Sequence, residues 1–170
     1  QTLKKGDYVI MQFGHNDASP LDDTARARGT IRGIGEDSTE IWNPIRKMKE
    51  VVHTYGWYMR KYVRETRDRK AIPIICSLVP RNSWKDGKVN RSADSWALWA
   101  KQVAEQEGAL FIDLNELVAA QYDALGEAAV KKFFPADNTH TNEEGAKRNA
   151  ATVIDRLRQL RPGSLVKYLQ

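Results

Sequence analysis

The sequence of 170 residues contains one cysteine, Cys76, which excludes intramolecular disulfides and cysteine-based metal clusters. No apolar run approaches the roughly 20 residues that span a bilayer, so we expect no membrane partner. Internal repeats, low-complexity tracts and linkers are missing as well. Hydrophobic residues make up 41% of the chain and charged residues 29%, which is typical of a globular domain. The composition therefore predicts one folded domain.

Charge of one sign does not dominate the sequence either. The 27 basic residues exceed the 22 acidic ones by only enough to give a net charge of +5, and the two signs are interspersed. Such mixing is typical of a solvated surface, so we expect no nucleic-acid partner, although the excess could attract an acidic polymer.

Three short apolar runs, at residues 7–13, 71–77 and 109–113, predict buried strands. Each run is nearly continuous rather than alternating, which favours a parallel sheet covered on both faces. Helical stripes lie between and after them, at residues 51–63, 96–103, 114–125 and 146–160. This alternation predicts an α/β fold with three layers and right-handed crossovers.

Two further local features carry predictions. Thr141 and Glu144 have the spacing of a capping box at the start of the last helix. The polar segment 18–44 shows no clean periodicity, and we expect it to be a long loop that forms a wall of the site.

Two polar motifs fall where strands end or helices begin. "GHND" at 14–17 directly follows the first predicted strand, and "DNTH" at 137–140 directly precedes the last helix. Ligands in open α/β sheets bind at the carboxyl ends of the strands. The loop that follows the second strand, with Arg81, reaches the same edge, so we expect one site there.

The residue types in these motifs suit acyl-transfer chemistry. His140 is a candidate general base, and Asp137, three residues earlier, is a candidate to hold its imidazole in one tautomer. Asn16 and the backbone N–H of Gly14 are candidate donors to an oxyanion. Simpler interpretations stay open: a surface contact or helix cap for the Asp–His pair, turns for Gly14 and Asn16, and capping for Asp17.

Taken together, the two motifs resemble the third and fifth sequence blocks of the SGNH (GDSL-type) hydrolases. The stretches "GDYVIMQFGHND", "HTYGWYMRKYV", "IICSLVPRN" and "DNTHTNEEGA" are similar to the rhamnogalacturonan acetylesterase branch of that family. The resemblance implies a flavodoxin-like three-layer fold and a serine esterase that deacetylates a pectin-type polysaccharide such as rhamnogalacturonan. It implies no metal and no organic cofactor, and it implies action outside the cytoplasm, in an extracellular or periplasmic location.

The resemblance also assigns residues. His140 and Asp137 would be the base and acid of the triad, and Asn16 would be a donor of the oxyanion hole, whereas Gly14 is an oxyanion-hole candidate from its position alone. His15 and Arg81 would contact an acetylated, acidic polysaccharide or oligosaccharide.

One departure from the family pattern concerns the nucleophile. The family places it in an N-terminal Gly-Asp-Ser block, and no serine here follows Gly-Asp or forms a G-x-S-x-G elbow. We therefore expect residues 1–170 to be the C-terminal two-thirds of one hydrolase domain that lacks its first two strands. The missing segment, or another chain, would complete the sheet and carry the serine, and this chain alone would be inactive.

Other hypotheses stay open on the residues alone. Ser77, at the end of the second strand, is the one substitute nucleophile within the chain that we consider. His15, Asp17, Asp137 and His140 could ligate a metal in a metal-dependent hydrolase. The chain could also be an inactive carbohydrate-binding fragment that stacks sugars on tryptophans such as Trp42.

Overall fold

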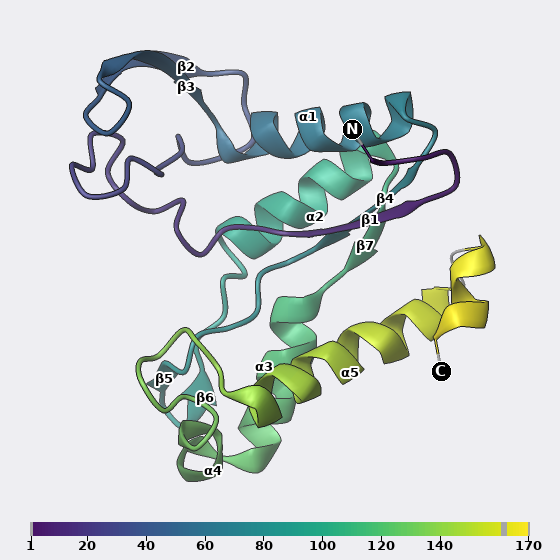
Figure 1. Ribbon diagram of the computed structural model, residues 1–170. Coiled ribbons are helices and arrows are strands. Elements are labelled where there is room, and N and C mark those ends of the chain that lie inside the picture. The colour runs from purple at the N-terminus through teal and green to yellow at the C-terminus, as the bar shows by residue number, and fades with distance from the viewer. Residues whose placement is uncertain (1, 161–162, 170) are drawn as a thin grey trace.

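The computed structural model describes residues 2–160 and 163–169, and it confirms an α/β fold with a parallel sheet (Figure 1). The sheet contains β1 (Tyr8–Gln12), β4 (Ile72–Cys76) and β7 (Leu110–Ile112), in the order β1-β4-β7 with every pair parallel. All three strands lie within the predicted runs. The flanking helices are α1 (Tyr55–Asp68), α2 (Trp96–Glu107), α3 (Leu114–Leu125), α4 (Glu127–Lys131) and α5 (Glu143–Leu160), and the chain ends in a 3₁₀ helix, Gly163–Tyr168.

Helices cover both faces of the sheet, which makes the three layers. In Figure 1, α1 and α2 lie on one side of the strands, and α3 and α5 lie on the other. Neighbouring residues of β4 point to opposite faces: Ile75 packs with Met59 of α1, whereas Ile74 packs with Val118 of α3. Because Ile74 and Ile75 are both fully buried, β4 needs apolar residues on each face, and its continuous run follows from that need.

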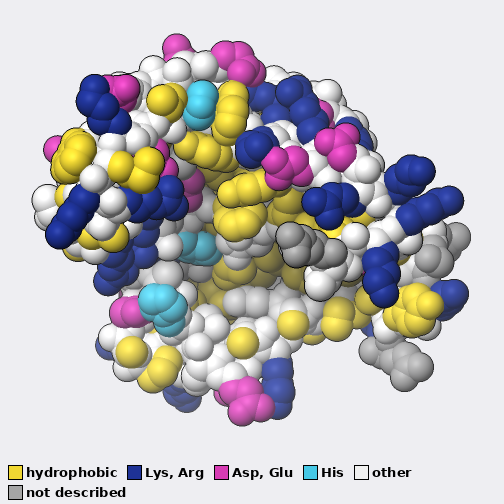
Figure 2. Space-filling model, turned by 45° about the horizontal axis from the view of Figure 1, so that its top comes forward, with side chains coloured by type: hydrophobic (Ala, Val, Ile, Leu, Met, Phe, Trp, Pro, Cys, Tyr) yellow, Lys and Arg dark blue, Asp and Glu magenta, His cyan; other side chains and the backbone are white. Residues whose placement is uncertain are grey.

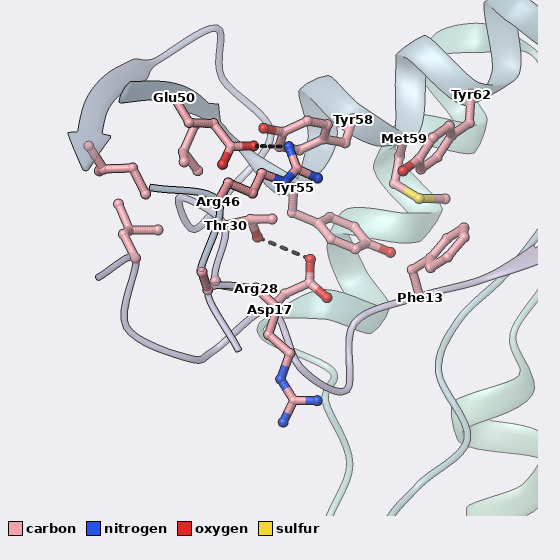
Figure 3. A pocket seen from close by; sticks show the side chains of 15 residues that line it. Phe13, Asp17, Arg28, Thr30, Arg46, Glu50, Tyr55, Tyr58, Met59 and Tyr62 are labelled. Atoms are coloured by element: carbon pink, nitrogen blue, oxygen red, sulfur yellow. Dashed lines mark hydrogen bonds and ion pairs between the residues drawn. The ribbon is translucent and has the colours of Figure 1, made fainter. Parts of the chain in front are cut away.

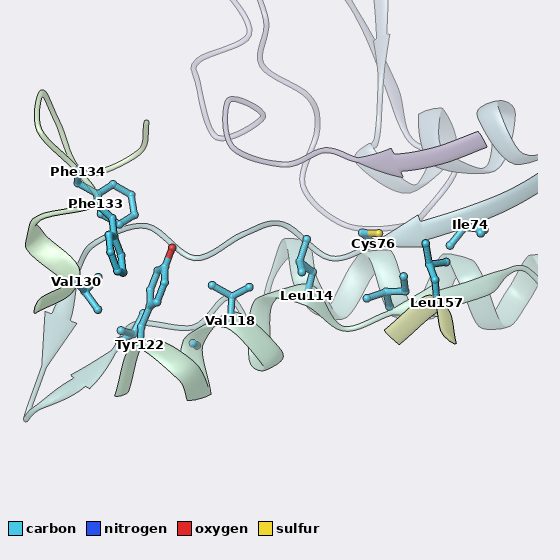
Figure 4. Packing of buried hydrophobic residues seen from close by; sticks show 12 residues of the cluster. Ile74, Cys76, Leu114, Val118, Tyr122, Val130, Phe133, Phe134 and Leu157 are labelled. Carbon is cyan, nitrogen blue, oxygen red and sulfur yellow. The ribbon is translucent and has the colours of Figure 1, made fainter. Parts of the chain in front are cut away.

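The core on the α3 side continues away from the sheet. Figure 4 shows Tyr122 of α3 beside Phe133, Phe134 and Val130, which lie near α4. The ring of Tyr122 lies 6.1 Å from that of Phe134 in an edge-on arrangement. This cluster anchors the segment that leads into the "DNTH" loop, because Phe134 precedes Asp137 by three residues.

Two antiparallel hairpins depart from the predictions. The first consists of β2 (Ser38–Asn43) and β3 (Met48–His53), and the second of β5 (Trp84–Lys85) and β6 (Lys88–Val89). Val51 and Val52 were predicted to open a helix, and that prediction is wrong. They pair with Glu40 and Thr39 across the first hairpin, since strand pairing with residues far outside a helical window overrides the local stripe.

Helix caps explain where α1 and α5 begin. The hydroxyl of Thr54 accepts a hydrogen bond from the backbone N–H of Trp57 and starts α1 after the hairpin. At α5 the cap is Asn142, whose side chain accepts from the N–H of Gly145. The predicted capping box of Thr141 and Glu144 is therefore wrong by one residue.

Strand β1 forms one border of the sheet. In the described ranges its second side pairs with no strand, and Ile10 and Phe13 are 46% and 45% exposed. Beside it runs a groove of about 600 Å³ lined by Val9, Met11, Phe13 and Tyr62, among others. Figure 2 shows a hollow on one face in which hydrophobic side chains gather. An apolar border strand of this kind is unusual, because natural edges are usually charged or covered.

No helix among residues 2–160 and 163–169 combines the length and the apolar character that crossing a bilayer requires.

Candidate active site

Three loops meet at the carboxyl ends of β1 and β4. They are the "GHND" loop, the loop after β4 and the "DNTH" loop before α5. Arg81, from the loop after β4, donates to the backbone carbonyl of His15 at 2.7 Å and to the hydroxyl of Thr139. The backbone N–H of Asn82 donates to the carbonyl of Asn138 at 2.8 Å. These contacts fasten the two predicted motifs to each other across more than a hundred residues of sequence.

His140 and Asp137 form the predicted pair. The Nδ1 atom of His140 lies 2.7 Å from Oδ2 of Asp137. The other carboxylate oxygen accepts from the backbone N–H groups of Thr139 and His140, at 2.7 and 2.8 Å. Since a carboxylate only accepts, Nδ1 carries the proton, and the unprotonated Nε2 of a neutral ring is free to take one.

The same hydrogen bonds set the charge of Asp137. The pKa of this carboxyl is held well below its usual range, first by the His140 side chain and then by the two backbone N–H groups. A folded-state pKa below the unfolded value means that the carboxylate's contribution to stability is present above the unfolded pKa. It is lost only as the pH falls through the depressed value. Asp137 is therefore ionised throughout the neutral range.

Asn16 and His140 line the same cleft. Its volume is about 480 Å³, and it is open to solvent, because the His140 side chain is 81% exposed. Asn16 is exposed as well, and its backbone carbonyl accepts from the N–H of Ser19 in a turn that leaves the side-chain amide in the cleft lining. The structure thus brings together the predicted base and the predicted oxyanion donor.

His15 lines the cleft with both ring nitrogens engaged. Its Nε2 lies 2.8 Å from the carbonyl of Val79, which can only accept, so Nε2 carries the proton. Nδ1 then accepts from the amide of Gln12 at 3.4 Å. Burial lowers the pKa of His15, the Val79 carbonyl raises it, and nearby Arg81 lowers it, with a net shift downward. A substrate contact by His15, like one by Arg81, stays a prediction.

Gly14 lies outside the lining of the cleft. It is buried at a φ of +128°, and a Cβ atom built there would lie 3.1 Å from Cβ of Trp96 in α2. Burial raises the pKa of Asp17, and the backbone N–H of Gly14 is one of the groups that oppose this shift. These contacts assign Gly14 to the turn and to helix packing, and its part in an oxyanion hole stays a prediction.

We expect Gly14→Ala to lower the free energy of unfolding by about 1–3 kcal/mol, because it combines an unfavourable φ with a close contact. Gly6→Ala is the matched control: Gly6 has a φ of +87°, and its added Cβ would meet nothing within 4 Å. Urea unfolding of both variants separates backbone strain from the Trp96 contact. Equal losses in the two variants would contradict a role for that contact.

Asp17 is directed away from the cleft. Its carboxylate accepts from the hydroxyl of Thr30 at 3.1 Å and lines a separate pocket, and burial raises its pKa. Consequently, the four residues of the metal hypothesis do not form one ligand set. Within residues 2–160 and 163–169, no group of three or more His, Cys, Asp or Glu side chains is arranged to hold a metal ion.

Ser77 is fully buried beneath the site. Its hydroxyl donates to Asp113 at 2.8 Å and accepts from the backbone N–H of Asn115 at 2.9 Å. These bonds tie the end of β4 to the start of α3, so the hydroxyl points into the protein rather than at His140.

Two arginines of the cleft were missed by sequence reasoning. Arg26 and Arg28 belong to the segment 18–44, and both line the cleft with Asn16 and His140. The segment was predicted to be a long loop that forms a wall of the site; Arg26 and Arg28 line the cleft, whereas Ser38–Asn43 form strand β2. The sequence does show two arginines close together, in the "RAR" at 26–28. Their position at the cleft could not be predicted, because it depends on how the loop folds.

Comparison with known proteins identifies a matching family and several similar esterases. The model of the GDSL-like lipase/acylhydrolase family matches residues 1–148. A rhamnogalacturonan acetylesterase of Emericella nidulans is 31% identical over 145 residues, which cover 85% of this chain and 58% of that protein. A probable rhamnogalacturonan acetylesterase of Bacillus subtilis, YesY, is 25% identical, with coverages of 93% and 65%. The chain thus spans about three-fifths of the length of these curated relatives.

Solved structures support the fold. Protein YxiM of Bacillus subtilis superposes with a TM-score of 0.69 at 21% identity, over 95% of this chain and 39% of that one. An acetyl-xylooligosaccharide esterase from Geobacillus superposes with a TM-score of 0.52 at 18% identity, over 88% of this chain and 58% of that one. At these identities the similarity shows a shared fold.

Proposed function

We propose, from the premise that this chain belongs to the GDSL-like lipase/acylhydrolase family, that it is the larger part of a serine esterase. The substrate we propose is an acetylated, acidic polysaccharide of the pectin type, such as rhamnogalacturonan. The names of the relatives support this substrate class. An extracellular or periplasmic location follows from such a substrate and belongs to the proposal.

The observation that carries the proposal is the pairing of Asp137 with His140 in a cleft that Asn16 also lines. His140, with Nε2 unprotonated, would take the proton of a serine hydroxyl as that oxygen attacks the ester carbonyl. The amide of Asn16 would donate to the developing oxyanion. His140 would then protonate the leaving sugar oxygen, and water would release acetate from the acyl-enzyme in a second, equivalent round.

The charges that border the cleft suit an acidic glycan. Arg26, Arg28 and Arg81 line it, and none of its described lining residues is an aspartate or glutamate. The guanidinium of Arg81 already donates hydrogen bonds to the neighbouring loops, so we assign Arg26 and Arg28 to a uronate carboxylate. Arginine suits that task because its planar guanidinium can donate two parallel hydrogen bonds to one carboxylate.

Two features, the source of the nucleophile and the unpaired border of the sheet, support the proposal that a further segment completes the domain. No described residue lining the cleft is a serine, and Ser77 is buried. A segment of the natural protein that adds strands beside β1 would cover Ile10 and fill the groove at Val9 and Met11. It would also bring a serine to the carboxyl end of the neighbouring strand, beside Asn16. We propose that such a segment completes the domain.

Labelling with a fluorophosphonate, which reacts with activated serines, tests the proposal. The full-length natural protein should release acetate from acetylated rhamnogalacturonan and lose this activity on labelling. Peptide mapping by mass spectrometry should place the labelled serine outside residues 1–170. The 170-residue chain alone should neither react nor hydrolyse the substrate.

The alternative outcomes are distinct. A label on Ser77 would overturn the assignment of the nucleophile, and a label on a separate polypeptide would show that another chain completes the sheet. Activity that resists the fluorophosphonate but is lost on chelation would contradict the serine esterase and favour a metal-dependent hydrolase.

A further inference from the structure

A second cavity lies apart from the cleft of His140. It has a volume of about 320 Å³ and is enclosed by the segment after β1, the loop 27–30, the first hairpin and α1 (Figure 3). Arg28 is the residue that borders both this cavity and the cleft. The pairing of Asp137 with His140 makes no use of this cavity.

Tyr55 places an unpartnered hydroxyl at this cavity. The residue is 1% exposed, and its hydroxyl oxygen has no hydrogen-bond partner among the described residues. Burial raises the pKa of this hydroxyl, with a smaller contribution from the charge of Asp17, so it stays protonated. A buried hydroxyl without a partner costs free energy, and a polar ligand in the cavity would remove that cost.

Asp17 supplies a second polar group to the cavity. Figure 3 shows its carboxylate between Thr30 and the ring of Tyr55. One carboxylate oxygen accepts from the Thr30 hydroxyl, and hydroxyl groups of a ligand could occupy the remaining acceptor positions. Asp17 and Tyr55 together thus offer one strong acceptor and one donor.

Aromatic and apolar side chains form the rest of the wall. Phe13 and Tyr62 lie with ring centroids 5.4 Å apart, and Tyr58 and Met59 line the cavity from α1. Aromatic faces beside a few convergent hydrogen-bonding groups are typical of sites that bind the apolar face of a sugar ring and its hydroxyls.

Charge selects among the possible ligands. The carboxylates of Asp17 and Glu50 disfavour an anionic group, and Glu50 is already paired with Arg46 at 3.2 Å. Arg28 and Arg46 at the border disfavour a cationic group. The chemistry that remains is that of an uncharged, hydroxyl-bearing ring.

We propose that this cavity, with Asp17 and Tyr55 as its polar groups, binds an uncharged sugar residue of the substrate chain. The inference rests on the proposed function, in which Arg26 and Arg28 hold a uronate in the cleft. The cavity borders the cleft at Arg28. A polymer in which uronates and uncharged sugars are neighbours would then place a uronate in the cleft and an uncharged sugar in the cavity.

Tyr55→Phe provides the test, because it removes only the unpartnered hydroxyl. The full-length natural protein should bind methyl α-rhamnoside, an uncharged sugar, with shifts of the NMR signals of Tyr58 and Tyr62. Methyl galacturonoside, an anionic sugar, should leave those signals unchanged. In Tyr55→Phe the rhamnoside affinity should fall about tenfold, as expected for the loss of one hydrogen bond to a ligand hydroxyl.

Tyr122→Phe is the matched control. The Tyr122 hydroxyl is also buried, but it donates to Asn149 at 3.1 Å on the other side of the sheet. Its removal should lower the melting temperature and leave rhamnoside affinity unchanged, whereas Tyr55→Phe should melt at or above the temperature of the unaltered chain.

Rhamnoside binding that is undetectable, or equal in Tyr55→Phe, would overturn the proposal, as would galacturonoside binding at these signals. Because neither probe carries an ester, the result is independent of hydrolysis. A failure of the esterase proposal would appear instead as missing acetate release by the full-length protein.

Discussion

His140→Ala should lower kcat for acetate release by roughly a thousandfold in the full-length natural protein, because general acid–base catalysis by one residue contributes about 10²–10⁴-fold. The imidazole is required twice in each turnover, first to activate the serine and then to activate water. Asp137→Asn should also lower kcat, by less, since the ring remains but its tautomer is no longer held. Titration of the released acetate measures both effects.

His53→Gln is the matched control for this prediction. His53 stacks on Trp57 with ring centroids 3.8 Å apart, at the end of the first hairpin, and it lies outside the lining of the cleft. Its replacement should leave kcat unchanged. Equal rates for the His140 and His53 variants would refute the base assignment.

Asn16→Ala should lower kcat by about 10²–10³-fold and change KM little, because an oxyanion donor acts on charge that develops only in the transition state. Steady-state kinetics on acetylated oligosaccharide separates the two parameters. A rise in KM at constant kcat would instead identify Asn16 as a residue that binds the ground-state substrate.

Asn90→Ala serves as the control for Asn16. Asn90 is exposed and donates to the hydroxyl of Ser83 at 2.7 Å, outside the lining of the cleft. Both variants remove one exposed amide, so a difference in kcat between them reports the position of Asn16 in the cleft.

Much of the fold was predictable because its signals are local. The strands β1, β4 and β7 are short apolar runs, and β4, which is buried on both faces, requires such a run whatever its neighbours are. The stripes of α2 and α3 were equally clear. The hairpin of β2 and β3 was not, because Val51 and Val52 fit a helical stripe and only their pairing with Glu40 and Thr39 decides the outcome.

The sequence by itself placed Asn16 at the carboxyl edge of the sheet, because a polar motif that directly follows an apolar strand reaches that edge in an α/β sheet. Asp137 and His140, which precede the last helix, were named as candidates from their spacing and from the resemblance of their motif. The tertiary structure alone decided that Arg81 fastens the two motifs together, that Arg26 and Arg28 border the cleft, and that the Tyr55 hydroxyl faces a cavity without a partner. These features depend on contacts between residues far apart in the chain, and such contacts leave no periodicity or spacing in the sequence.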